Sequence, residues 1–157
     1  MKERGTSTGV LAGTIVVIVV VVAVVAAVIL INSNRSGGGS GGGSKVEVTN
    51  TPSTVHIGDQ ATFTISVTNN ESGTMTILGG TEKAYRNGQL IDTHSSSINE
   101  FFTTTIPAGQ TVTVYSVTAP VPSTYSGTSM VGTWTYALSL DTNYGALTDS
   151  CSLTVLS

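Results

Sequence analysis

The sequence predicts a mainly β protein, with one N-terminal transmembrane α-helix followed by a β-sandwich of about seven strands. Two observations carry this prediction. Residues 10–31 form an apolar run, VLAGTIVVIVVVVAVVAAVILI, without a charged side chain. From Lys45 onward, short stretches of alternating apolar and polar residues are separated by turn residues. We therefore expect a short cytoplasmic leader (1–9), a membrane helix (10–31), a flexible linker (32–44) and an outer domain (45–157).

The apolar run has the length of a membrane-spanning helix. An α-helix rises about 1.5 Å per residue, so the run would extend about 33 Å, close to the thickness of a bilayer core. Backbone amides in lipid must bond within their own segment, so the many valines do not argue against a helix. The run is too long for a secretory signal, and residues 32–35 offer no Ala-x-Ala cleavage site. Because Lys2 and Arg4 precede it, we expect the outer domain to be extracellular or pseudoperiplasmic.

The first residues carry a short motif. Glu3-Arg4-Gly5 precedes Thr6 and the Val-rich run, and this order resembles the class III, prepilin-type leader of archaeal surface proteins, including pilins and archaellum components. The resemblance implies that a membrane peptidase cuts between Gly5 and Thr6 and leaves the helix on the mature protein. Val10 stands where many bacterial pilins carry glutamate, which weakens a bacterial type IV pilin assignment and leaves the archaeal one open. An uncleaved membrane anchor is the alternative.

The linker predicts loose coupling between helix and outer domain. Residues 36–44 read SGGGSGGGS, a composition typical of a flexible coil with an average reach of about 15–18 Å. The same repeat is also used as an engineered linker. A flexible tether favours a displayed module, because a filament subunit needs its head held in a fixed relation to its packed helix.

Strands are expected wherever apolar residues recur at every second position. Ala61, Phe63, Ile65 and Val67 alternate with threonine and serine, and Trp134, Tyr136 and Leu138 form a second clear series. Asn87-Gly88 between two short runs predicts a hairpin, because both residues tolerate positive φ. Further alternations surround the following apolar residues: Val46, Val48, Val112, Val114, Val117, Leu140, Cys151, Leu153 and Val155.

Short strands at regular intervals, with no helical pattern after residue 31, favour an immunoglobulin-like sandwich. Trp134 is expected in its core. The segments 56–59 (HIGD), 63–69 (FTISVTN) and 106–110 (IPAGQ) resemble the cell-adhesion-related immunoglobulin-like repeats of prokaryotic surface proteins. This resemblance covers most of the outer domain and implies the fold, without implying an activity.

Composition limits the function classes. Charged residues make up 10% of the chain and the formal net charge is −3, so there is no basic patch for nucleic acid. Cys151 is the only cysteine and has no internal partner for a disulfide. We expect it to be a small buried residue rather than a link between two chains.

No residues are predicted to be catalytic, to bind a cofactor or to bind a metal. His56 and His94 are the only histidines, and neither has metal-ligand or catalytic spacing. His94 lies near Asp92 and precedes Ser95-Ser96-Ser97, but closeness in sequence does not establish the geometry of a catalytic triad. We therefore expect a protein that is not an enzyme and that needs no cofactor.

Acidic and amide side chains near turns raise the question of calcium. Five of them fall at such positions, but calcium needs six to eight converging oxygen ligands, and aspartate and asparagine in turns usually bond to the backbone. The backbone role is therefore preferred. The five residues are Asp59, Glu100, Asp141, Asn143 and Asp149. Two sequons, beginning at Asn34 and Asn70, are tentative glycosylation sites in regions expected to be exposed.

These observations predict a membrane-tethered extracytoplasmic sandwich that binds another cell-envelope protein, such as a surface-layer or filament component, as an anchoring or adhesion module. The alternative is a type IV pilin-like filament subunit assembled through its helix, where Ala23 and Ala27 give a weak small-residue packing signal. A small-solute receptor is less favoured, because the domain is too short for two lobes. The expected partners are the membrane and another envelope or filament protein. Self-association stays open, and nucleic acid is not expected.

Overall fold

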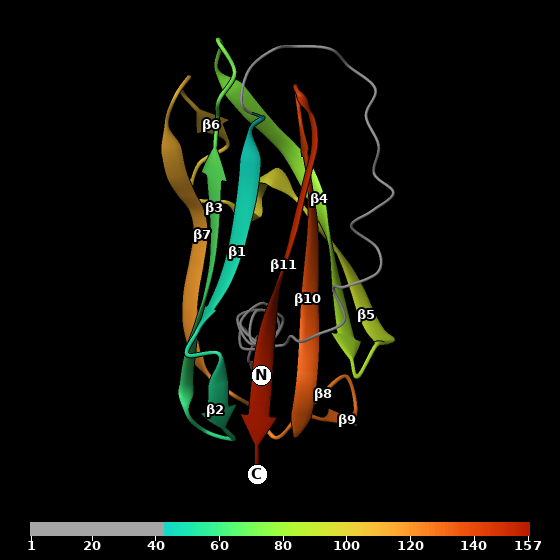
Figure 1. The fold of residues 1–157 in the computed structure, drawn as a ribbon. Coiled ribbons are helices and arrows are strands. Elements are labelled where there is room, and N and C mark those ends of the chain that lie inside the picture. The colour runs from blue at the N-terminus through green and yellow to red at the C-terminus, as the bar shows by residue number, and fades with distance from the viewer. Residues whose placement is uncertain (1–42) are drawn as a thin grey trace, which may run out of the picture.

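A computed structural model describes residues 43–157, which form two β-sheets packed face to face (Figure 1). The predicted leader, the predicted membrane helix and nearly all of the predicted linker lie outside these residues. Within residues 43–157, no helix is long and apolar enough to cross a membrane. The mainly β class and the sandwich are confirmed.

The first sheet has the strand order β1-β3-β7, in which all neighbours are antiparallel. Its strands are β1 (Lys45–Thr51), β3 (Gln60–Thr68) and β7 (Thr111–Pro120). The second sheet contains the antiparallel pair β10 (Gly132–Thr142) and β11 (Gly145–Leu156), with the short β2 (Thr54–His56) parallel to the end of β11.

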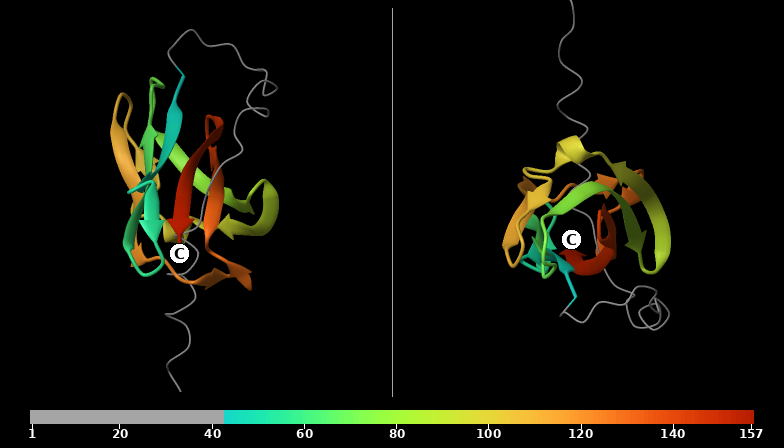
Figure 2. Two further views of the ribbon diagram at one scale, coloured as in Figure 1. Left: turned by 60° about the horizontal axis from the view of Figure 1, so that its bottom comes forward. Right: turned by 90° about the horizontal axis from the view of Figure 1, so that it is seen from above.

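Two further strands extend the second layer beyond β10. β4 (Met75–Arg86) lies along β10, and hydrogen bonds tie both its ends there: Asn143 N to Thr76 O and Asn87 N to Thr133 O, each 3.1 Å. β5 (Gln89–Ser96) pairs with β4 and lies at the side of the sandwich (Figure 2). The short elements are η1 (Ile98–Glu100), β6 (Thr105–Ile106), β8 (Thr124–Tyr125) and β9 (Thr128–Ser129).

The chain passes from one sheet to the other at the very start of the domain. β1 pairs with β3 in the first sheet, and after the cis Thr51–Pro52 bond β2 pairs with β11 in the second. This arrangement agrees with the predicted immunoglobulin-like architecture. The parallel pairing of β2 was not predicted, because three residues are too few to show a periodic pattern.

The core forms where the alternating residues of the two sheets meet. Phe63 and Trp134 are 1% and 0% exposed, which confirms their predicted positions in the core. The Phe63 ring meets that of Tyr136 edge to face with centroids 4.4 Å apart, a favourable aromatic geometry. The indole nitrogen of Trp134 donates to Met130 O at 2.7 Å, so its burial leaves no polar group unpaired.

The predicted hairpin has a clear local cause. Asn87 and Gly88 have φ of 49° and 83°, as a tight hairpin between β4 and β5 requires.

Asn69 is fully buried, and its side-chain nitrogen donates to Ile106 O and Gly73 O, each at 2.8 Å. Gly109 N donates to Asn69 O at 2.7 Å. Asn69 therefore joins the end of β3 to the turn before β7, which explains why the asparagine and the Pro-Ala-Gly turn occur together.

The register of β3 gives a test of the core. We expect Phe63→Ala and Trp134→Ala each to lower the free energy of unfolding by about 3–5 kcal/mol, since each empties a filled aromatic site. Thr64→Ala is the matched control on the opposite face of β3, where its hydroxyl meets that of Ser116 at 3.2 Å, and it should change stability by less than about 0.5 kcal/mol. Urea unfolding of the Lys45–Ser157 fragment measures all three. A larger loss for Thr64→Ala than for Phe63→Ala would contradict the register.

Candidate functional site

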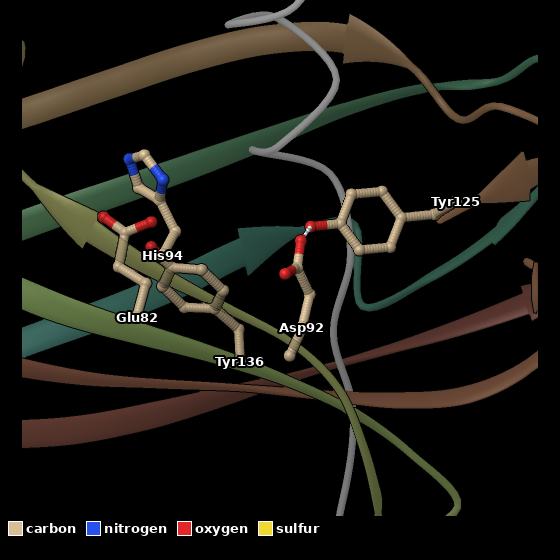
Figure 3. A pocket seen from close by; sticks show the side chains of 6 residues that line it. Glu82, Asp92, His94, Tyr125 and Tyr136 are labelled. Carbon is tan, nitrogen blue, oxygen red and sulfur yellow. Dashed lines mark hydrogen bonds between the residues drawn. The ribbon is translucent and has the colours of Figure 1, made fainter. Parts of the chain in front are cut away.

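A group of ionisable side chains lies on the β5 side of the sandwich. A small recess there is lined by residues of four strands, with a cavity volume of about 10 Å³. This is about the space that one water molecule needs, so the recess does not accommodate an organic ligand. The lining residues are Glu82, Ala84, Asp92, His94, Tyr125 and Tyr136 (Figure 3).

Glu82 reaches this recess because the alternation of β4 changes phase at a glycine. Met75 and Ile77 are buried at the start of the strand, whereas Ala84 is buried and Lys83 exposed near its end. Between them, Gly79 has φ of 150°, a conformation that favours glycine. Unbroken alternation from Met75 would have placed Lys83 inside. The shift instead turns a carboxylate inward and a cation outward.

Each carboxylate near the recess has its own hydrogen-bond partner. The Ser96 hydroxyl donates to Glu82 Oε1. The Tyr125 hydroxyl donates to Asp92 Oδ2 (Figure 3). His94 Nε2 lies 3.2 Å from Glu100 Oε2. Because each acid is engaged by a different donor, the acids are stabilised in place separately.

The electrostatics keep the tyrosines protonated at neutral pH. Burial and the carboxylates of Glu82 and Glu100 raise the pKa of Tyr115 to about 12. Burial, followed by contacts with Asp92 and Glu82 respectively, raises the pKa of Tyr125 and of Tyr136. Their hydroxyls are therefore available as hydrogen-bond donors to the acids.

Two opposing effects act on the pKa of Glu100. Burial favours its neutral form, but hydrogen bonds from Ser97 and the contact with His94 outweigh burial and lower the pKa of this carboxyl. The Ser97 backbone N–H donates to Glu100 Oε1 at 2.9 Å, which completes a capping box on η1. The charged form of Glu100 thus holds the segment between β5 and β6.

The structure does not bring Asp92, His94 and one of the serines 95–97 together as a triad. Asp92 bonds to Tyr125, His94 bonds to Glu100, and Ser95 is exposed. The buried Ser96 hydroxyl donates to a carboxylate rather than to the imidazole. This arrangement therefore activates no nucleophile in the manner of a triad.

The turn acids serve mainly as backbone caps, as expected. Asn143 Oδ1 accepts from Thr76 N at 2.7 Å, Asp149 Oδ2 accepts from Val48 N at 2.7 Å, and Asp59 Oδ2 accepts from His56 N at 2.9 Å. Asp141 is exposed on β10. In the part of the chain that the structure describes, no three acidic, histidine or cysteine side chains gather closely enough to hold a metal ion.

Cys151 is less buried than predicted, and Asn70 is exposed as predicted. Cys151 is half-buried and its sulfur accepts from Asn50 Nδ2 at 3.0 Å; burial first, and then the Asp149 carboxylate, raises the pKa of the thiol to about 12. Asn70 is exposed between β3 and β4, so its glycosylation stays a prediction. Gly5, Thr6 and Asn34 lie outside the described residues.

One surface feature was not predicted from the sequence. Phe102 is 67% exposed and stacks on Tyr115, with ring centroids 5.9 Å apart and planes 16° apart. Its backbone N–H donates to Val114 O on β7 at 2.8 Å. Tyr115 in turn meets Phe63 edge to face at 6.3 Å. The aromatic contacts thus continue from the core to the surface. The Phe101-Phe102 doublet was the available signal, because adjacent residues of an extended segment face opposite sides.

Comparison with known proteins identifies no family. Neither a protein-family model nor a curated protein matches the sequence. A DNA-bound alkylpurine DNA glycosylase AlkC of Pseudomonas fluorescens is similar in fold at a TM-score of 0.50 and 9% identity, over 73% of this chain and 30% of the glycosylase. The sporulation control protein Spo0M of Bacillus subtilis has a TM-score of 0.49 and 14% identity, over 74% of this chain and 50% of Spo0M.

Smaller domains also match. The CARDB domain of the PF1109 protein of Pyrococcus furiosus, solved with di-metal ions, has a TM-score of 0.40 and 16% identity, over 73% of this chain and 94% of that domain. The chain spans half or less of Spo0M and AlkC, the first two structures compared. At these identities the likeness concerns the β-sandwich fold alone.

The lowered pKa of Glu100 predicts a pH-dependent contribution to stability. A carboxyl whose pKa is lower in the folded state stabilises fully above its unfolded pKa, about 4.3, and loses this contribution as pH falls through the folded value. We expect the Glu100→Gln variant to lose less stability than the parent when the pH is lowered from 6 to about 3, measured by urea unfolding. Equal losses in both proteins would contradict the prediction.

The raised pKa of Cys151 predicts a poorly reactive thiol. Reagents attack the thiolate, and at pH 7.5 this thiol stays protonated and half-buried. We expect reaction with a chromogenic disulfide reagent to be at least about a hundredfold slower for the folded protein than for the protein in urea. A thiol that reacts equally fast in both states would show that Cys151 is accessible and ionised.

Proposed function

We propose that this protein is a membrane-tethered extracytoplasmic module that binds another cell-envelope protein for anchoring or adhesion. The single observation that carries the proposal is the uncharged run of residues 10–31 ahead of a Gly/Ser-rich segment and a β-sandwich. The run supplies the membrane anchor and the segment supplies reach. The proposed role is binding without catalysis, and the separate engagement of Asp92, His94 and Ser96 supports it.

The sheet edges favour contact through a face or through loops rather than by strand addition. An exposed edge offers unpaired backbone groups to any chain. Here Val48 N on β1 is bonded to Asp149, Val114 O on β7 is bonded to Phe102 N, and Thr93 N on β5 is bonded to Asp92 at 2.8 Å. Each of these three edges thus has at least one backbone group engaged within the domain.

Tethering makes a weak contact sufficient. A domain held near the envelope by a flexible segment meets its partner at a high effective concentration. A freely diffusing domain would need a large apolar interface to stay bound to its partner for the same fraction of the time. The tethered domain does not need one.

The type IV pilin-like subunit is the second candidate, and the Glu3-Arg4-Gly5 motif ahead of the Val-rich run favours it. It predicts that copies of the helix pack together and that the sandwich decorates the outside of a filament. The glycine-rich segment 36–44 argues for tethering instead.

Two measurements separate these candidates. We expect the full chain to stay with membranes through a carbonate wash, and the Lys45–Ser157 fragment to bind isolated envelopes saturably, with binding lost after protease treatment of the envelopes. The fragment unfolded in urea is the control for adsorption. If the fragment binds nothing and the full chain purifies as filaments, the pilin-like candidate replaces the tethered module. Recovery of the full chain as a soluble monomer without detergent would contradict both.

A further inference from the structure

The side of the sandwich between β5 and β7 differs in chemistry from the rest of the surface. It carries Phe102, the most exposed large hydrophobic residue of the described chain at 67%, and Ile98, which is 48% exposed. Phe102 stacks on Tyr115. Glu100 ends η1 two residues before Phe102 and lies 3.2 Å from His94 on β5, and Glu82 on β4 accepts from Ser96 at the end of β5. We define the acidic-aromatic side by five of these residues: Glu82, Ile98, Glu100, Phe102 and Tyr115.

Phe102 is exposed, but its position is fixed by contacts with the rest of the domain. Its ring rests on Tyr115, which itself contacts the core residue Phe63, and its backbone is bonded to β7. The neighbouring Phe101 is buried at 8% exposure and fixes the segment from the other side. A partner would therefore order few new rotamers on binding, which is the property of an efficient anchor residue.

The charges of this side are unbalanced. Among residues 45–157 there are three lysines and arginines against eight aspartates and glutamates. In the described part of the chain, Glu100 has a salt-bridge contact only with His94, and neither Glu82 nor Asp92 contacts a lysine or arginine. Lys83, the nearest cation along β4, is turned to the outer face by the shift at Gly79.

The outer face of the first sheet offers a contrast. Its hydroxyls are paired across β3 and β7, for example Thr62 with Thr118 at 2.8 Å and Thr68 with Thr111 at 2.9 Å. Such a face has neither an apolar anchor nor an excess of one charge. The features of an energetic interface centre, an exposed fixed aromatic ring beside unbalanced charge, occur together at the acidic-aromatic side.

We propose that the acidic-aromatic side docks a basic segment of another envelope protein, one that carries lysine or arginine beside an apolar side chain. The apolar side chain would pack on Phe102 and Ile98, and the cations would face Glu82 and Glu100, where the aromatic rings add cation–π attraction. This assignment of site and partner chemistry rests on the proposed binding function.

The test uses the full chain in nanodiscs of zwitterionic lipid. A phage-displayed random peptide library is selected on it after removal of phage that bind empty nanodiscs. We expect the selected peptides to be enriched in lysine or arginine next to apolar residues. Their affinities, measured with synthetic peptides by fluorescence anisotropy, should weaken as salt is raised, because the attraction is screened.

Three variants locate the contact. Phe102→Ser should weaken peptide binding about tenfold or more, and Glu100→Gln should reduce the salt dependence. Leu156→Ser is the matched control, since it removes a 42% exposed apolar residue at the end of β11 beside β2, and it should change affinity less than about twofold. The Phe102→Ser and Leu156→Ser variants should unfold at the same urea concentration as the parent, within the error of the measurement. A change in peptide affinity then does not come from unfolding of the domain.

Several results would overturn the proposal. Peptides without cationic enrichment, or equal affinities for the Phe102 and Leu156 variants, would show that this side is not the docking surface. A dimer that Phe102→Ser converts to a monomer, with no peptide selected, would assign the side to a second copy of the chain. If the fragment carrying Phe102→Ser still binds envelopes like the parent, the site assignment fails while the proposed function stands.

Discussion

The edge-to-face contact between Phe63 and Tyr136 is the interaction on which the rest of the structure depends. It joins β3 of the first sheet to β10 of the second at a centroid distance of 4.4 Å, at the level where the two layers must interdigitate. The chain has no internal disulfide to hold the layers together, since Cys151 is its only cysteine. Cohesion between the sheets therefore depends on side-chain packing, and this aromatic pair connects the apolar core to the polar β5 side, where Tyr136 lines the recess.

The polar side follows from a constraint on β4. This strand must pair with β5 and also lie along β10, where Gly80 comes so near that an added Cβ would stand 3.1 Å from Ser139 O. Two adjacent glycines let the backbone meet this requirement, and the phase of alternation changes at the same point. Glu82 is thereby turned toward the recess, where it is half-buried and accepts from Ser96 on β5. One backbone irregularity thus produces both the half-buried carboxylate and the outward Lys83.

The sequence was sufficient to predict the β-sandwich that follows Lys45 and insufficient to predict the β5 side of it. The series around Phe63 and Trp134 obeys strict period-two alternation, and Asn87-Gly88 has a strong conformational preference, so local chemistry determines both. The position of Glu82 depends instead on a phase shift that alternation alone does not reveal. The proximity of Glu100 to His94 depends on η1 folding back beside β5. Such contacts arise from tertiary structure, as does the stacking of Phe102 on Tyr115.

The distribution of charge indicates why recognition would concentrate on one side. Serine and threonine make up 37 of the 113 residues from Lys45 to Ser157, and those on β3 and β7 satisfy one another across the strands. Such surfaces bind water about as well as they bind a partner, so contact with them yields little net free energy. A fixed aromatic ring removes apolar area from water on contact, and unbalanced carboxylates select the charge of what approaches. On a hydroxyl-rich and charge-poor domain, these are the features from which the proposed docking at one side is argued.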